Sequence, residues 1–206
     1  MLLTGSEIIR QVSTGGVRIE PFQPEQVEQN SYGFRLGHRL VECAEPVFDS
    51  RLPPTRVAPT LIPPTGVVLQ PDRLYLGETL EIIGSTEHAC ELYGTLSVAA
   101  LGVWIQVSAP LGHTGAVVRW TLEIRVTQPI RVHAGMMIGK VAFWGVDGDV
   151  TPYHGRYAGQ IAVTQSRLAS DDAGRLASDD AGRLASDDAG RLASDDANSD
   201  AGRLAS

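Results

Sequence analysis

One carboxylate occupies the middle of the most regular strand pattern in the sequence. In the stretch AVVRWTLEIRV (residues 116–126), apolar residues alternate with polar ones, which predicts a β-strand with one face against a core. Glu123 lies on the polar face, together with Arg119 and Arg125. A carboxylate can act as a general base, but the pattern alone favours a solvated Glu123 that is paired with Arg119 or Arg125.

The residues that could bind a metal ion or act as nucleophiles are few and scattered. Cys43 and Cys90 do not form a C-x-x-C pair, which argues against a structural zinc site. His88 precedes Cys90 by two residues, but this H-A-C stretch has too few companions for a metal site. We therefore interpret these residues and His113 as surface or core side chains, and we expect both thiols to be free.

The elements that must position these side chains are mostly strands. A capping-box pattern from Thr4 to Glu7 precedes apolar residues at helical spacing, which predicts one short helix ending near Gly15. Further along, β-branched and alternating stretches are separated by Gly, Pro and Asn, which predicts an all-β barrel or sandwich. Residues 49–66, with five prolines, are predicted to form a loop. The predicted strands cover residues 17–22, 32–42, 66–70, 73–83, 102–109, 116–126, 130–134 and 137–146.

The last forty residues differ from the rest of the chain. From Arg167 the octapeptide RLASDDAG recurs with little variation, and the segment contains 5 Arg and 9 Asp but no aromatic or β-branched residue. One Leu in each repeat cannot bury enough surface to offset the entropy of the chain. We predict one β domain over residues 1–166, followed by a disordered acidic tail over residues 167–206.

The composition also restricts the partners. The formal net charge is −7, and neither the tail nor the preceding part is basic, which argues against duplex nucleic acid as a partner. No apolar run reaches the ~18 residues that a membrane-spanning helix needs. The N-terminal stretch MLLTGSEIIRQV is too short and too polar for a signal peptide. We expect a cytoplasmic protein that does not enter a membrane.

Four stretches occur in an order that is typical of one enzyme family. They are EPFQPEQVEQNSYGFRLGHR, GTLSVAALGVWIQVSAPLGHTG, WTLEIRVTQPIRVHAGMMIGKVAFW and PYHGRYAGQ. Together they resemble the dCTP deaminase family from residue 1 to about residue 167. The resemblance implies a mainly β fold with a short N-terminal helix, the distorted β-barrel or jelly roll that the family shares with trimeric dUTPases. It also implies a homotrimer with active sites between subunits, and deamination of a cytosine nucleotide, such as dCTP to dUTP and ammonia.

The resemblance places Glu123 on the catalytic glutamate of the family. There the carboxylate acts as a general base: it takes a proton from the water that attacks C4 of cytosine, and the proton is passed to the departing amine. A closed, partly apolar pocket raises the pKa of a carboxylate and improves the base. Zinc deaminases use H-x-E and P-C-x-x-C, a signature that this sequence lacks. The resemblance thus implies zinc-independent chemistry with no protein-bound cofactor; magnesium, where used, would accompany the nucleotide phosphates.

Other residues match family positions one at a time. Ser97 matches the second Ser of the family's R-S-S and is the second candidate catalytic residue. Two family segments supply the candidate substrate-binding residues: V-T-A, whose backbone reads the cytosine edge, and the C-terminal segment that closes over the triphosphate. These residues are Val107, Ser108, Ala109, Tyr153, Arg156, Tyr157 and Gln160, and no metal-binding residue is implied.

The phosphate-binding part of the family pattern is altered. The family's R-S-S-x-x-R is here TLSVAA (95–100), which lacks both arginines, and Arg156 stands where the family has Lys. Each hydrogen bond to a charged group contributes about 1.5–3 kcal/mol, so losing two or three would weaken triphosphate binding roughly 10²- to 10⁵-fold. The family's D-P-G is here HTG (113–115). Because an Asp near this position activates water in dUTPases, its absence argues against dUTPase activity.

Three functions are open at this point. The first is a cytosine-nucleotide deaminase, for which Glu123, Ser97 and the segment from Tyr153 to Gln160 are retained. The second is a non-catalytic nucleotide-binding or regulatory relative, which the missing arginines favour. The third is a trimeric scaffold that presents the acidic tails. We rank them in this order.

Overall fold

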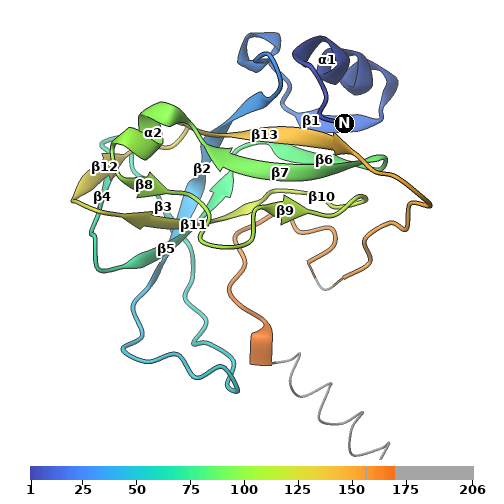
Figure 1. Cartoon of the computed structure of the whole chain (residues 1–206). Coiled ribbons are helices and arrows are strands. Elements are labelled where there is room, and N and C mark those ends of the chain that lie inside the picture. Colours follow the sequence, from blue (N-terminus) through green and yellow to red (C-terminus); the bar gives the residue numbers. More distant parts are fainter. Residues whose placement is uncertain (156, 170–206) are drawn as a thin grey trace, which may run out of the picture. The chain divides into compact units, whose positions relative to one another are not determined.

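A computed structural model describes residues 1–155 and 157–169 of the chain. The described residues divide into two units, residues 1–45 with 56–165, and residues 46–55 with 166–169. All labelled helices and strands of Figure 1 belong to the first unit. The octapeptide repeat lies outside the described residues beyond position 169, so the disordered acidic tail and the domain boundary at 166 stay predictions.

The first unit is mainly β, as predicted. Its helices are α1 (Gly5–Thr14), the 3-10 helix η1 (Pro24–Gln26) and α2 (Leu96–Ala100). Its strands are β1 (Val17–Glu20), β2 (Tyr32–Cys43), β3 (Thr60–Leu61), β4 (Val67–Leu69), β5 (Leu74–Thr79), β6 (Ile82–Ser85), β7 (His88–Gly94), β8 (Val103–Trp104), β9 (Leu111–Gly112), β10 (Val117–Val118), β11 (Thr121–Val126), β12 (Ile130–Val132) and β13 (Met137–Gly145).

The largest sheet of the described residues is antiparallel and curled. Its strands follow the order β8-β11-β5-β2-β13-β7-β9, and β3 pairs with β2. The sheet bends into half a barrel (Figure 1), and two smaller sheets have the orders β1-β6-β10 and β12-β4. Strand β11, which carries Glu123, is therefore paired on both edges for part of its length, with β5 and with β8.

The hydrophobic core fixes which face of β11 carries Glu123. Leu122, Ile124 and Val126 are buried in the core, Glu123 is half-buried and Arg125 is exposed, as the alternation predicted. Burial of one such apolar side chain stabilises the fold by about 1.5–3 kcal/mol. A shift of one residue in register would exchange the two faces, so the core holds Glu123 on the opposite face of the sheet.

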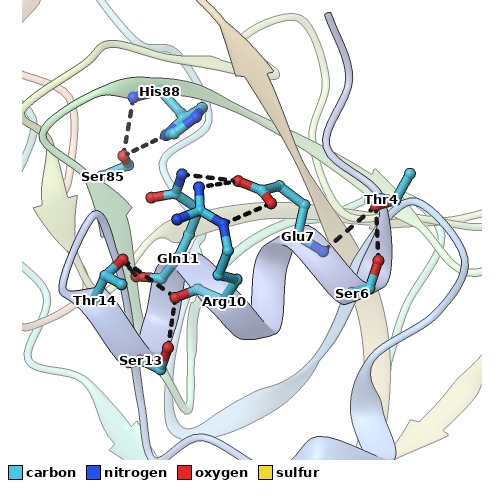
Figure 2. Close-up of polar contacts among 9 residues, drawn as sticks. All are labelled: Thr4, Ser6, Glu7, Arg10, Gln11, Ser13, Thr14, Ser85 and His88. Atoms are coloured by element: carbon cyan, nitrogen blue, oxygen red, sulfur yellow. Dashed lines mark hydrogen bonds and ion pairs between the residues drawn. The ribbon is translucent and has the colours of Figure 1, made fainter.

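Helix α1 begins and ends where the local sequence predicted. The Thr4 hydroxyl accepts the Glu7 N–H at 3.4 Å, and Gly15 follows the helix with φ +86°, a left-handed conformation that suits glycine. Arg10 and Gln11 both donate to the Glu7 carboxylate (Figure 2). Caps act within a few residues of a helix end, which is why the sequence alone predicted where α1 begins and ends.

The H-A-C stretch is part of the fold, as predicted. Ser85 Oγ donates to the Gly16 carbonyl at 2.6 Å. It also accepts the His88 N–H at 2.9 Å and lies 3.2 Å from His88 Nδ1 (Figure 2). Cys43 and Cys90 are both free thiols. Cys90 is fully buried, and this burial raises the pKa of its thiol to about 12, which suppresses its reactivity.

Several elements did not emerge from the sequence pattern: the short η1, β3 and β9, strand β7 and helix α2. Strand β7 alternates correctly, with His88, Cys90 and Leu92 buried, but it contains no β-branched residue that would favour a strand. Helix α2 spans a little more than one turn and begins where the Thr95 hydroxyl accepts the Val98 N–H at 3.4 Å. A helix of that length is too short to produce a helical periodicity in the sequence.

The strand predicted over residues 102–109 was too long. Only β8 (Val103–Trp104) is formed, followed by one more ladder-like bond from the Glu123 N–H to the Ile105 carbonyl at 2.9 Å. The next available donor, the Val107 N–H, binds the side chain of Glu123 instead of a backbone carbonyl. The Glu123 carboxylate therefore takes the place of the backbone carbonyl that would accept the Val107 N–H if the strand continued.

The predicted proline-rich loop is confirmed apart from β3. In the second unit, residues 46–55 form no helix or strand. Asp49 closes a turn there, because its Oδ1 accepts the Arg51 N–H at 2.9 Å and its carbonyl accepts the Leu52 N–H at 3.1 Å.

Candidate active site

The Glu123 carboxylate is held by the backbone of the segment that follows β8. Glu123 lies opposite Leu76 of β5, on the sheet face away from the core. Its Oε2 accepts the Val107 N–H at 2.9 Å. No described residue donates a hydrogen bond to its other oxygen, Oε1. The arrangement fixes one carboxylate oxygen and leaves the other available to a ligand, at a half-buried position.

The neighbouring arginines do not neutralise Glu123. Arg119 points its guanidinium at the backbone, where Nη1 donates to the carbonyls of Thr79, at 3.3 Å, and Leu80. Within the part of the chain that the structure describes, Glu123 has no Lys, Arg or His partner within 4.0 Å. The ion pair with Arg119 or Arg125 that the alternation favoured is therefore wrong for these residues.

Four of the other residues predicted from the resemblance are exposed and lie near β8. Val107, Ser108 and Ala109 are exposed, and they directly follow the backbone that contacts Glu123. Ser97 is also exposed, on α2, which packs beside β8. No hydrogen bond in residues 1–155 and 157–169 joins Ser97 to Glu123, so the structure places these two candidate catalytic residues without direct contact.

The chain after β13 returns to β11. We call residues 151–155 and 157–165 the return segment. Its Tyr153 N–H donates to the Thr114 carbonyl at 2.9 Å, and its Gln160 carbonyl accepts the Arg119 N–H at 3.1 Å. Its Thr164 N–H donates to Oγ1 of Thr121 at 3.1 Å. These three hydrogen bonds hold the return segment beside residues 114–121, so that it reaches the strand that carries Glu123.

Aromatic contacts shape the first half of the return segment. The Tyr153 ring stacks on His113, with ring centroids 5.3 Å apart. The Tyr153 hydroxyl accepts the Tyr157 N–H at 3.4 Å. Gly155 allows the Tyr153 ring to approach this turn closely, because a Cβ there would lie 2.3 Å from the end of the ring. His113, which we interpreted as a surface or core side chain, is exposed and stacks against a candidate substrate-binding residue.

The structure brings together only part of the predicted set. Glu123 contacts Val107 directly, and Tyr153, Tyr157 and Gln160 share the return segment. Arg156 lies outside the described residues. Which of these residues touch a substrate stays a prediction.

Sequence reasoning missed two residues that connect these parts. Thr121 stands two residues before Glu123 on the same strand face, and its hydroxyl binds Thr164 of the return segment. Ile105 provides the carbonyl that accepts the Glu123 N–H. The position of Thr121 on the polar face was visible in the alternation, but its partner 43 residues further along was not.

A second carboxylate lies on the same face of the sheet. Glu78 of β5 is opposite Thr121 and is only 3% exposed. Its Oε1 is 3.7 Å from Arg39 Nη1, and its Oε2 has no hydrogen-bond partner among the described residues. The face around Glu123 therefore carries a further acceptor beside the half-buried carboxylate.

The described residues contain no group of three or more His, Cys, Asp or Glu side chains that could hold a metal ion. In the same residues, no helix is long and apolar enough to cross a membrane.

A family model described as dCTP deaminase-like matches residues 2–146 of the chain. The chain belongs to the dCTP deaminase-like family. Relatives of this family include a dCTP deaminase, dUMP-forming, from Clostridium acetobutylicum, which is 36% identical over 172 residues, covering 83% of this chain and 98% of the relative. Another with the same name, from Leptospira biflexa serovar Patoc, is 34% identical over 172 residues with the same coverage. The resemblance seen in the sequence motifs is therefore confirmed.

A solved structure of the dCTP deaminase-like family shows the same fold. It is the crystal structure of 2′-deoxycytidine 5′-triphosphate deaminase from Agrobacterium tumefaciens, with a TM-score of 0.55 and 18% sequence identity. The match covers 69% of this chain and 47% of that chain. At this identity the likeness supports the fold alone.

Proposed function

We propose that the protein deaminates a cytosine nucleotide without zinc, with Glu123 as the general base. The observation that carries this proposal is the contact between Glu123 Oε2 and the Val107 N–H at 2.9 Å, with Oε1 left unpartnered among the described residues. A base must lie within hydrogen-bond reach of the proton that it abstracts, and a fixed carboxylate with one available oxygen meets this requirement. The names of the relatives, dCTP deaminase, dUMP-forming, support cytosine as the base.

The chemistry needs one water and no external oxidant. A water held by Glu123 loses a proton to Oε1 and attacks C4 of the cytosine ring. The proton passes from Glu123 to the exocyclic amine, the C4–N bond breaks and ammonia leaves. The hydroxyl that was added to C4 becomes the carbonyl of uracil as its proton moves to N3. The backbone of Val107, Ser108 and Ala109 would hold the cytosine edge, and Ser97 would help position the reacting groups. General acid–base catalysis of this kind contributes about 10²- to 10⁴-fold to a rate.

The number of phosphates on the substrate is the open part of the proposal. Helix α2 carries no basic residue, so it has no positive side chain that could bind a triphosphate. Its exposed surface includes the apolar Leu96, which is 84% exposed. In the proposal, the phosphates are bound by residues of the C-terminal region, namely Tyr153, Arg156, Tyr157 and Gln160. Magnesium would be coordinated by the phosphates and not by protein side chains. The name of the relatives, dCTP deaminase, dUMP-forming, gives a monophosphate product, so dUMP and dUTP are both products to look for.

We further propose that the active enzyme is a homotrimer. Large apolar side chains are exposed on and around α2 and β8: Leu96, Leu101, Trp104, Val107 and Leu111 are between 51% and 84% exposed. Such a concentration of exposed apolar side chains is typical of a subunit interface. A second copy of the chain that covers this surface would also enclose Glu123. Light scattering of the purified protein tests the assembly, and a monomer would contradict it.

An ammonia-release assay with chromatography of the products tests the function. The panel contains dCTP, CTP, dCMP, CMP and deoxycytidine with magnesium, and Glu123→Gln is the control variant. We expect turnover of at least one compound by the wild type and none above background by Glu123→Gln. Equal rates for the two proteins would exclude Glu123 as the base.

A non-catalytic nucleotide-binding relative is the second candidate. The absence of basic residues on α2 favours it, because a weakened phosphate site can bind without supporting turnover. In that case the trimer would form and titration calorimetry would detect nucleotide binding, but no compound of the panel would release ammonia.

A further inference from the structure

We propose that the Thr121 hydroxyl positions the return segment for nucleotide binding beside Glu123 of the same chain. The inference rests on the proposed function, because it assigns a role in the binding of that nucleotide. Thr121 is a positioning residue here: it acts through the return segment and does not touch the reacting atoms.

The position of Thr121 couples two parts of the candidate site. Thr121 and Glu123 lie two positions apart on β11 and share the face that is turned away from the core. Glu123 is fixed by the Val107 N–H, and Thr121 fixes the Thr164 N–H at 3.1 Å. The same face of β11 therefore binds two segments: Glu123 binds the segment after β8, and Thr121 binds the return segment.

The return segment depends on this bond because no strand ladder holds it. Residues 151–155 and 157–165 form no strand. Two backbone hydrogen bonds hold its first part, from Tyr153 to Thr114 and from Arg119 to Gln160. The hydrogen bond from Thr164 to the Thr121 hydroxyl then connects the segment to β11. At the end of the segment, Gln165 Oε1 accepts the Val57 N–H at 3.1 Å. A substitution of Thr121 that removes the hydroxyl therefore loosens the stretch between Gln160 and Gln165, which borders the candidate ligand Gln160, and leaves the backbone contacts of Tyr153 and Gln160 intact.

Releasing the segment should reduce affinity more than turnover. Tyr157, 39% exposed, and Gln160 are the described candidate ligands on this segment. A segment that is already fastened loses less conformational entropy when a nucleotide binds than a loose one. Once the nucleotide is bound, Glu123 and its Val107 contact are unchanged, so the chemical step should proceed as before.

The test compares Thr121→Val, which keeps the shape but removes the hydroxyl, with Thr121→Ser, which keeps the hydroxyl. Amide hydrogen exchange at Thr164 reports the bond itself, and kcat, KM and the dissociation constant of dCTP report its consequence. For Thr121→Val we expect exchange at Thr164, KM and the dissociation constant to rise about threefold to tenfold, the effect of one neutral hydrogen bond. We expect kcat to change by less than about twofold, and Thr121→Ser to restore the wild-type values.

Two different failures can be told apart. Wild-type turnover with unchanged exchange and KM in Thr121→Val would overturn this inference and leave the proposed function intact. A parallel fall of kcat and melting temperature without a rise in KM would also overturn it, because that pattern reports a purely structural role. If the wild type releases no ammonia, the deaminase proposal fails, and the dissociation constants of the two variants still decide whether Thr121 supports nucleotide binding.

Discussion

Glu81 and Glu123 are both glutamates on the large β unit, but the chain surrounds them differently. Glu81 is fully buried, and its two oxygens accept the Arg35 Nε–H at 2.7 Å, the Arg35 backbone N–H at 2.9 Å and the Gln26 side chain at 3.4 Å. Glu123 is half-buried and accepts one bond, from Val107. A carboxylate whose acceptors are used by its own chain stabilises the fold, whereas one with an unused oxygen at a partly open position can serve a ligand.

Removing the Glu123 carboxylate should have the largest effect of all, and on activity only. We expect Glu123→Gln to lower the deamination rate by about 10²- to 10⁴-fold, because the variant cannot accept the proton from water. The amide oxygen can still accept the Val107 N–H, so the thermal melt should match that of the wild type. A large loss of stability with retained activity would mean that Glu123 is a structural residue like Glu81.

Removing Glu81 should have the opposite profile. Glu81→Ala leaves the Arg35 guanidinium, 20% exposed, without its ion-pair partner, and breaking a buried pair costs about 3–5 kcal/mol. Urea denaturation measures this change in the free energy of unfolding. The matched control is Glu20→Ala, because Glu20 and its partner Arg18 are both 60% exposed and an exposed pair contributes only about 0.2–1 kcal/mol. Equal effects of the two substitutions would contradict the contrast between buried and exposed carboxylates.

Substitution of Gln26 tests whether the hydrogen bond from Gln26 to Glu81 contributes to stability in addition to the ion pair between Glu81 and Arg35. The Gln26 amide donates to the Gly33 carbonyl at 2.6 Å as well as to Glu81. Gln26→Ala leaves the Gly33 carbonyl without this donor, so we expect a loss of about 1–3 kcal/mol in the free energy of unfolding, again by urea denaturation. An unchanged urea midpoint would show that the ion pair with Arg35 suffices.

Glu7, whose side chain is 32% exposed, should show the smallest effect, visible only in acid. Hydrogen bonds from Arg10 and then Gln11 lower the pKa of Glu7 from 4.5 to about 2. Because the folded-state pKa is depressed, this contribution to stability is present above pH 4.5 and is lost as the pH falls toward 2. Thermal melts between these pH values should fall less steeply for Glu7→Gln than for the wild type. Parallel pH profiles would contradict the assignment.

Local signals predicted elements whose partners are close in sequence. Thr4, Glu7 and Gly15 predicted both ends of α1, since caps act within a few residues. The alternation in residues 116–126 predicted the buried and exposed faces of β11. Strand β7 was missed because its inward residues include His88 and Cys90, whose burial depends on strand β13 and not on their own β propensity.

The sequence by itself determined the mainly β class, the family and the face of β11 that carries Glu123, because periodicity and motif order are properties of the chain alone. Only the tertiary structure decided what Glu123 and Thr121 contact. Arg119 is four residues from Glu123 in sequence, yet its guanidinium turns to backbone carbonyls near residue 80, and the donor to Glu123 comes from Val107, 16 residues away. Such contacts depend on where one strand ends and another segment returns, which hydrogen bonds between distant residues decide.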